Sequence, residues 1–195
     1  MEQIQEKTLD YKPWISSGKT VGLVFHSNFE LCLVDYIEKH KNERQLKLPG
    51  GKRKRNNDLD ILTESSESCI ERELREEIFV KISEKKFAGT LIIEDERRAG
   101  FLHTKDVYVI ESDQYKEIGK VHEKQVYERK YYPIDEAWDN VHKNHKSLLA
   151  IGLVYFFNNH LEIKKQHELI AMFAEGEVMK IKNKNEHFIK KVMKK

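Results

Sequence analysis

Three glutamates lie close together in the segment 72–78, which reads Arg-Glu-Leu-Arg-Glu-Glu-Ile. On a helix, residues three and four positions apart share a face, so Glu73, Glu76 and Glu77 converge. Carboxylates at this spacing repel one another unless a divalent cation or an arginine neutralises them. Hard oxygen ligands favour Mg²⁺ or Mn²⁺, and Mg²⁺ commonly completes its octahedron with water and phosphate oxygens. The spacing therefore indicates phosphate chemistry at a metal site.

A helix that carries these carboxylates is predicted over residues 65–78, with Ser65 as its N-cap. Ile70, Leu74 and Ile78 repeat every four residues and give the helix one apolar stripe. Upstream, a strand at 46–48 is expected to end at Pro49, Gly50 and Gly51. Such a turn exposes backbone groups without side-chain cover and can approach a ligand closely.

The remaining elements give an α+β pattern. Apolar runs at 21–25 and 31–34, separated by turn-forming residues, predict a β-hairpin. Beyond residue 160 the sequence is helix-forming and increasingly basic. Further strands are expected at 87–93, 107–110 and 125–132, and further helices at 134–141 and 147–157. Strands around an acidic helix, followed by more helices, favour a sheet packed by helices.

The acidic segment resembles the signature of the Nudix hydrolases, G-x5-E-x7-R-E-U-x-E-E-x-G-U, where U is aliphatic. Residues 72–77 fit its central part, Val80 fits the last aliphatic position, and Glu64 stands at the upstream glutamate. Asp58 occupies the first glycine position if the spacing is kept, and Phe79 replaces the second. A glycine before the final aliphatic residue usually gives a left-handed helix terminus, which costs other residues about 1 kcal/mol or more. Phe79 either accepts that cost or ends the helix differently.

An insertion explains the first departure. Twelve residues separate Gly51 from Glu64 where the signature has five, so 52–58 would form an enlarged loop. Its basic residues follow the glycine turn directly and could contact substrate phosphates. They could equally form a solvated or localisation-like patch. These residues are Lys52, Arg53, Lys54 and Arg55.

The resemblance implies a Nudix-like α/β/α sandwich with a mixed sheet over residues 18–160. Residues 1–17 would be an N-terminal extension, and 161–195 a basic helical appendage that packs on the domain or on a partner. Within the family, residues 123–146 are most similar to the diphosphoinositol polyphosphate and diadenosine polyphosphate phosphohydrolases.

The resemblance also implies a mechanism in which water attacks a phosphorus of a diphosphate while divalent ions neutralise its oxygens. Arg72, as a partner of Glu76, and Glu64 would support the ligands from behind. The general base stays open between Glu73, Glu77, Glu123 and Glu128. The implied metal ligands are Glu73, Glu76, Glu77 and the carbonyl of Gly50.

The formal net charge of the 195 residues is only +2, although 35% of them are charged, so the chain is not a polycation built for nucleic acid. Cys32 and Cys69 lack metal-ligand spacing and are expected to be reduced and buried. No apolar run reaches membrane-spanning length and no export signal is recognisable, so a cytoplasmic location is expected.

Three functions remain open at this point. The first is metal-dependent hydrolysis of a phosphoanhydride bond in a small nucleoside diphosphate-linked or polyphosphate substrate. The second is a catalytically weak module that binds a nucleotide or RNA. The third is an RNA 5′-end pyrophosphohydrolase, in which the basic tail contacts the phosphate backbone. The tail could instead pack on a second subunit, giving a homodimer.

Overall fold

The computed structural model describes residues 15–38, 43–56, 61–94, 101–111, 115–117 and 126–193. Its strands are β1 (Ile15–Val24), β2 (Leu31–Glu38), β3 (Glu43–Lys47), β4 (Gly50–Lys52), β5 (Arg55–Asn56), β6 (Ile61–Leu62), β7 (Val80–Ile82), β8 (Lys86–Glu94), β9 (Leu102–Ile110), β10 (Tyr115–Glu117) and β11 (Val126–Tyr132). Its helices are α1 (Ser66–Glu77), α2 (Ile134–Asn140), α3 (Lys143–Asn159), α4 (Leu161–Gln166) and α5 (Glu168–Met193).

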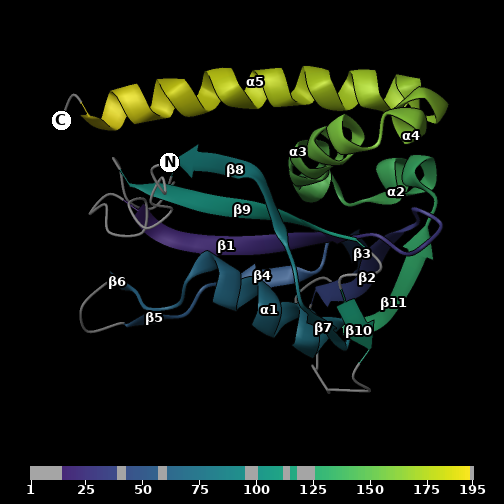
Figure 1. The fold of residues 1–195 in the computed structure, drawn as a ribbon. Helices are drawn as coiled ribbons and strands as arrows, with labels where there is room; N and C mark the ends of the chain where they lie inside the picture. Colours follow the sequence, from purple (N-terminus) through teal and green to yellow (C-terminus); the bar gives the residue numbers. More distant parts are fainter. Residues whose placement is uncertain are drawn as a thin grey trace, which may run out of the picture.

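Two sheets form the middle layer of the molecule. The larger has the order β4-β1-β9-β8, in which β1 and β9 run parallel and the other pairs run antiparallel. The smaller is antiparallel, with the order β11-β2-β3. Figure 1 shows α1 on one side of this layer and α3 with α5 on the other. The predicted α+β class, with a mixed sheet between helices, is confirmed.

The second half of β1 is buried on both faces, and its alternate residues point to opposite faces. Leu23 belongs to the apolar cluster that includes α3, whereas the next residue, Val24, belongs to the cluster on the α1 side. The predicted stripe of α1, Ile70, Leu74 and Ile78, lies in the second cluster and is fully buried. The predicted burial of the two free cysteines is also confirmed.

The predicted β-hairpin is wrong. A turn does reverse the chain, with the His26 N–H donating to the Glu30 carbonyl at 2.8 Å, but only Phe25 and Leu31 then form a bridge. β1 continues between β4 and β9, and β2 continues between β11 and β3. β1 and β2 are inner strands of different sheets, so distant strands satisfy the backbone N–H and C=O groups that a local hairpin would have paired.

Part of the predicted enlarged loop, 52–58, forms a strand. Arg55 lies opposite Leu62, and Asn56 lies opposite Ile61, so β5 and β6 form a short ladder. The inserted residues are therefore closed by a short antiparallel ladder before the signature helix begins. β7 and β10, which pair with each other, were not predicted from the sequence.

The C-terminal region begins with α4 and continues as the long helix α5, which crosses over α3 and β8 (Figure 1). Ala171, Ala174 and Ile181 of α5 belong to the core cluster on the α3 side. The Asn185 side chain donates to the Thr90 carbonyl at 2.9 Å and accepts the Ile92 N–H at 3.0 Å. It therefore bonds to the β8 backbone as a further strand would.

The predicted domain limits at 17/18 and 160/161 stay predictions. β1 begins at Ile15, inside the predicted extension 1–17. α5 exposes Leu169, Met172 and Phe173, and the predicted homodimer also stays a prediction. In the described part of the chain, no helix is both long and apolar enough to span a bilayer.

Candidate active site

The acidic helix forms as predicted. The Ser65 hydroxyl accepts the Ser68 N–H at 3.0 Å, which satisfies one of the donors that a helix start leaves open. The apolar stripe of α1 packs on the sheet and fixes the rotation of the helix about its axis. This rotation buries Glu73 and Glu77, which are 6% and 7% exposed.

The glycines lie directly against these carboxylates. The Gly50 N–H donates to Oε2 of Glu77 at 2.6 Å. Gly50 has a φ of +140°, and a Cβ there would lie 2.1 Å from the Thr20 carbonyl oxygen. A Cβ at Gly51 would lie 2.2 Å from Oε1 of Glu73. No other residue type fits either position without rearrangement, and the segment is an edge strand, β4, rather than only a turn.

Arg72 connects the acidic side chains behind the glycines. Its Nε and Nη2 donate to the two carboxylate oxygens of Glu64 at 2.8 and 2.9 Å. Its Nη1 donates to Glu73 at 2.7 Å and to Glu76 at 3.1 Å, so the predicted pair with Glu76 is present. Hydrogen bonding to Arg72 is the main reason that the pKa of Glu64 falls to about 2. An arginine therefore neutralises part of the acidic cluster.

The three candidate metal carboxylates do not converge on one point. In the described residues, no group of three His, Cys, Asp or Glu side chains is arranged to hold a metal ion. Glu73 and Glu77 line a cavity, whereas Glu76, 36% exposed, pairs with Arg72. The chemistry of the donors nevertheless fits a hard divalent cation, because two buried carboxylates lie against the backbone of two glycines. Bringing in Glu76 requires a change in its pairing with Arg72.

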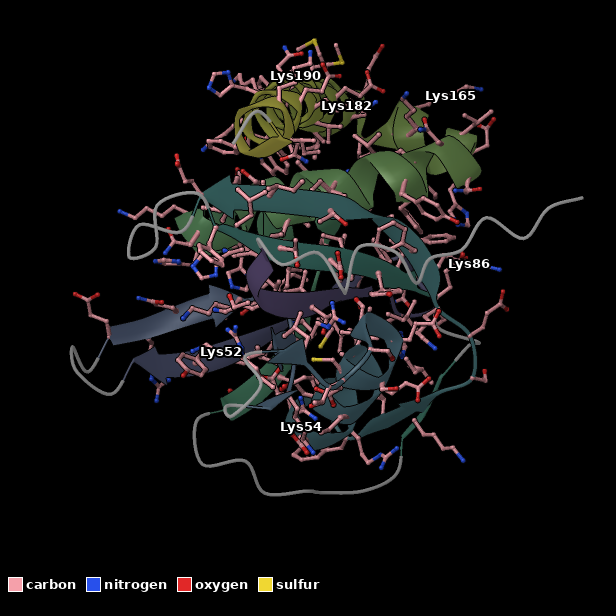
Figure 2. All side chains as sticks on the ribbon, turned by 90° about the vertical axis from the view of Figure 1, so that its left-hand side faces the viewer. Lys52, Lys54, Lys86, Lys165, Lys182 and Lys190 are labelled. Carbon is pink, nitrogen blue, oxygen red and sulfur yellow. The ribbon has the colours of Figure 1, made fainter. Side chains whose placement is uncertain are left out.

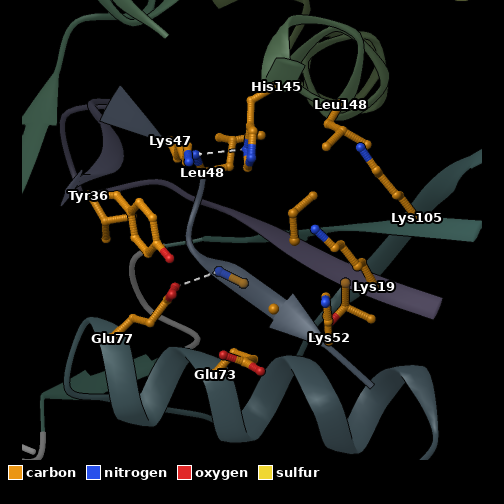
Figure 3. A pocket seen from close by; sticks show the side chains of 15 residues that line it. Lys19, Tyr36, Lys47, Leu48, Lys52, Glu73, Glu77, Lys105, His145 and Leu148 are labelled. Carbon is orange, nitrogen blue, oxygen red and sulfur yellow. Dashed lines mark hydrogen bonds between the residues drawn. The ribbon is translucent and has the colours of Figure 1, made fainter. Parts of the chain in front are cut away.

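The cavity has a volume of about 440 Å³ and lies between α1 and the sheets (Figure 3). Glu73 and Glu77 form its acidic side. Figure 3 shows Lys19, Lys105 and His145 across the cavity from α1. The basic residues that line it are Lys19, Lys47, Lys52, Lys105 and His145. One cavity therefore combines a carboxylate side with a strongly positive side.

The four basic residues predicted to contact phosphates do not share one surface. Only Lys52 lines the cavity. The Arg53 side chain is 2% exposed, donates to the Glu64 carbonyl at 2.9 Å and lies 3.9 Å from a carboxylate oxygen of Asp106. Lys54 is exposed, apart from Lys52 (Figure 2), and Arg55 belongs to β5. Successive residues of extended backbone point in opposite directions, which separates neighbours in the sequence.

Two of the four candidate bases line the cavity. Glu73 and Glu77 do so, whereas the Glu128 side chain on β11 is 55% exposed, pairs with Lys130 at 3.1 Å and is not part of the cavity wall. Glu123 lies outside the described residues. In the part of the chain that the structure describes, Glu73 and Glu77 are therefore the candidate bases that face the cavity.

Sequence reasoning missed Lys19, Lys47, Lys105 and His145. The three lysines come from β1, β3 and β9, and His145 comes from the first turn of α3. In the sequence, the three lysines stand out only as single basic residues in or near predicted strands. The His145 Nδ1 accepts the Leu48 N–H at 3.2 Å, and burial followed by the nearby lysine charges lowers the pKa of His145 to about 3. His145 is therefore neutral at physiological pH.

Phe79 accepts the left-handed conformation, with a φ of +61°. Of the two alternatives for this position, the structure shows that the glycine conformation is kept without the glycine. Arg129 donates to the Ile78 carbonyl at the end of α1, and its guanidinium lies 5.8 Å from the centre of the Phe79 ring. A cation at this end also interacts favourably with the helix dipole. The loop geometry after α1 is therefore preserved.

No family model matches the sequence, and no curated protein matches it. Solved structures do. An ADP compounds hydrolase aligns with a TM-score of 0.57 at 13% identity over 74% of each chain. A MutT Nudix hydrolase from Burkholderia pseudomallei aligns with a TM-score of 0.52 at 15% identity, over 68% of this chain and 95% of its own.

A Nudix hydrolase from Nitrosomonas europaea aligns with a TM-score of 0.51 at 13% identity, over 64% of this chain and 76% of its own. At these identities the alignments establish the architecture. The chain therefore has the fold of the Nudix hydrolases, as the signature segment predicted.

Proposed function

We propose that this protein is a divalent-metal-dependent hydrolase that cleaves a phosphoanhydride bond in a small diphosphate-containing substrate. The observation that carries the proposal is the pair of buried carboxylates, Glu73 and Glu77, which line a cavity beside the glycine strand and across from lysines. Arg72 compensates part of the charge of Glu73 at 2.7 Å, and a divalent cation would add positive charge on the cavity side of both carboxylates. The Nudix fold and the signature residues support the same activity.

Glu73 and Glu77 would hold Mg²⁺ or Mn²⁺, with Glu76 and the Gly50 carbonyl as further ligands. The bound metal would neutralise phosphate oxygens and lower the pKa of a coordinated water. Arg72 fixes Glu73 and Glu76 from behind, and the Gly50 N–H holds one oxygen of Glu77. Glu73 or Glu77 would also accept the proton from the attacking water, because these two candidate bases face the cavity.

The test is hydrolysis with Mg²⁺ or Mn²⁺, followed by identification of the products. The panel is ADP-ribose, diadenosine polyphosphates, nucleoside triphosphates, diphosphoinositol phosphates and capped RNA. Glu77→Gln should lower kcat by about 100-fold or more on any accepted substrate. The substitution removes one carboxylate ligand of the metal that would neutralise the charge developing on the phosphate oxygens. The matched control is Glu71→Gln, since Glu71 lies on the same helix but pairs with Lys85 at 2.8 Å. Equal turnover by the two variants would overturn the proposal.

A second candidate is a Nudix-like module that binds a nucleotide or RNA without turnover. The pairing of Glu76 with Arg72 favours it, because this pairing removes one carboxylate from the candidate metal site. Tight binding without hydrolysis of any compound in the panel would support this candidate. An RNA 5′-end hydrolase would add binding that weakens steeply with salt, through the basic end of α5.

A further inference from the structure

Three of the cavity lysines form a row across three neighbouring strands. Lys19 of β1 lies directly opposite Lys52 of β4 on one side and directly opposite Lys105 of β9 on the other. Residues in direct register point to the same face of a sheet, with Cβ atoms about 5 Å apart. The cavity lies on this face, since all three line it. Figure 3 shows the three side chains on one side of the cavity.

Like charges in direct register destabilise a sheet, so this row needs a reason. In the described part of the chain, neither Lys19, Lys52 nor Lys105 has an ion-pair partner. Lys19 is exposed to the cavity, but its ammonium group is partly removed from bulk water. This partial burial, followed by the charges of Lys105, Lys52 and Lys47, lowers its pKa. The row therefore gathers three positive charges on one side of the cavity, and the acids of the same cavity, Glu73 and Glu77, lie on α1.

Two further groups extend the row. The Lys47 Nζ lies 4.2 Å from the centre of the Tyr36 ring, and both residues line the cavity. His145 is neutral, and its Nδ1 accepts the Leu48 N–H, so its Nε2 carries the proton. This side of the cavity therefore offers four cations and one neutral N–H donor, with its two acids on α1. Such a set is suited to bind an anion with several negative groups.

We propose that Lys52, Lys19 and Lys105, together with Lys47 and His145, form a subsite for a cluster of phosphate groups beyond the bond that is cleaved. The preferred substrate is then a small molecule with several phosphates, rather than a simple dinucleotide diphosphate. This inference rests on the proposed function for the identity of the cleaved bond. Of the basic residues 52–55 that were predicted to contact phosphates, the subsite keeps Lys52, because Arg53 is buried and Lys54 lies outside the cavity.

The subsite can be tested by calorimetric binding of inorganic tripolyphosphate to the full chain, with EDTA present so that no divalent metal contributes. The protein should bind tripolyphosphate, and Lys19→Gln should weaken binding about tenfold, as expected for the loss of one charge-assisted contact. Lys19→Gln combined with Lys105→Gln should weaken it further. The control is Lys81→Gln, because Lys81 is exposed on β7 outside the cavity, and binding should not change. No binding, or equal weakening by the control, would overturn the subsite.

A second arm identifies what carries the phosphates. Inositol hexakisphosphate and adenosine triphosphate are titrated under the same conditions. The ligand whose binding depends most on Lys19 identifies the class of molecule that carries the phosphates. Binding of all three without dependence on Lys19 would also overturn the subsite. Circular dichroism and the unfolding midpoint of each variant check that a loss of binding is not a loss of fold.

The outcome is separable from that of the proposed function. Glu77→Gln should keep tripolyphosphate binding in EDTA while losing hydrolysis. If wild-type protein hydrolyses no substrate but tripolyphosphate binding still depends on Lys19, the proposed function fails and the subsite stands. If hydrolysis requires Glu77 but tripolyphosphate does not bind, the subsite fails and the proposed function stands.

Discussion

At the scale of single residues, Arg72 determines the state of the acidic cluster. Its guanidinium donates to Glu64, Glu73 and Glu76 at 2.7 to 3.1 Å, using both sides of the planar group. A lysine would present one compact charge and could not hold the same three carboxylates in fixed directions. Arg72 thus keeps Glu64 ionised and orients Glu73 toward the cavity. One residue of the signature therefore has both a structural and a positioning role.

This network predicts an acid-sensitive contribution to stability. The pKa of Glu64 is about 2 in the folded protein, below its usual value, so Glu64 stabilises the fold above its unfolded-state pKa. That contribution is lost as the pH falls from roughly 4.5 toward 2. Glu64→Gln should therefore lower the free energy of unfolding at pH 7 more than at pH 3.

The measurement is urea denaturation of wild-type protein and Glu64→Gln at both pH values in EDTA. Glu67→Gln serves as control, because Glu67 is exposed and lies 3.6 Å from Lys85, away from Arg72. A difference between wild type and Glu64→Gln that is the same at pH 7 and pH 3 would contradict the prediction.

At the scale of elements, the end of α1 positions the strand that follows it. Phe79 has a φ of +61°, a conformation that costs a residue with a Cβ about 1–2 kcal/mol. The bond from Arg129 to the Ile78 carbonyl holds this end against β11, and the ring of Phe79 lies beside the same guanidinium. Val80 and Ile82 then enter the core. The surrounding contacts therefore keep a strained residue in place.

The strain can be separated from the ring contact with two substitutions. Phe79→Ala removes the ring but keeps the left-handed strain, whereas Phe79→Gly removes both. Phe79→Gly should therefore be more stable than Phe79→Ala by about 1 kcal/mol. Thermal and urea unfolding of the two variants measure this difference. Equal stability would mean that the backbone at this position is not strained.

At the scale of the whole molecule, α5 joins the C-terminal region to the far edge of the larger sheet. Asn185 pairs with the backbone of β8 at Thr90 and Ile92, and the buried side of α5 enters the cluster around α3. β9 lies beside β8 and carries Lys105. The helix therefore supports the outer strands of the sheet that also holds the lysine row.

Asn185→Ala should lower the free energy of unfolding by about 1–3 kcal/mol, because a part-buried N–H and a carbonyl of β8 lose their partner. Urea denaturation tests this, with Asn183→Ala as control, since Asn183 is exposed two residues earlier on the same helix. Hydrogen exchange at Ile92 should also become faster in Asn185→Ala. Unchanged stability and exchange would mean that α5 is not fastened to the sheet at this point.

The sequence by itself determined the local features of the site. The N-cap at Ser65, the apolar stripe of α1, the common face of Glu73 and Glu77, and the close backbone approach at Gly50 depend on helix periodicity and backbone sterics, whereas the conformation of Phe79 stayed open between two alternatives. These are short-range rules, so a few neighbouring residues are enough to predict them. The α+β class followed from the same periodicities.

Only the tertiary structure decided which distant residues meet. The register of β4, β1 and β9 brings Lys52, Lys19 and Lys105 into one row, and no local pattern encodes a register between strands so far apart in the sequence. The same long-range pairing divided the expected hairpin between two sheets, and the alternation of extended backbone turned Arg53 inward while Lys52 kept its place in the cavity. The carboxylates of the site could therefore be predicted from one helix. Its basic side could not, because it forms only when separate strands pair.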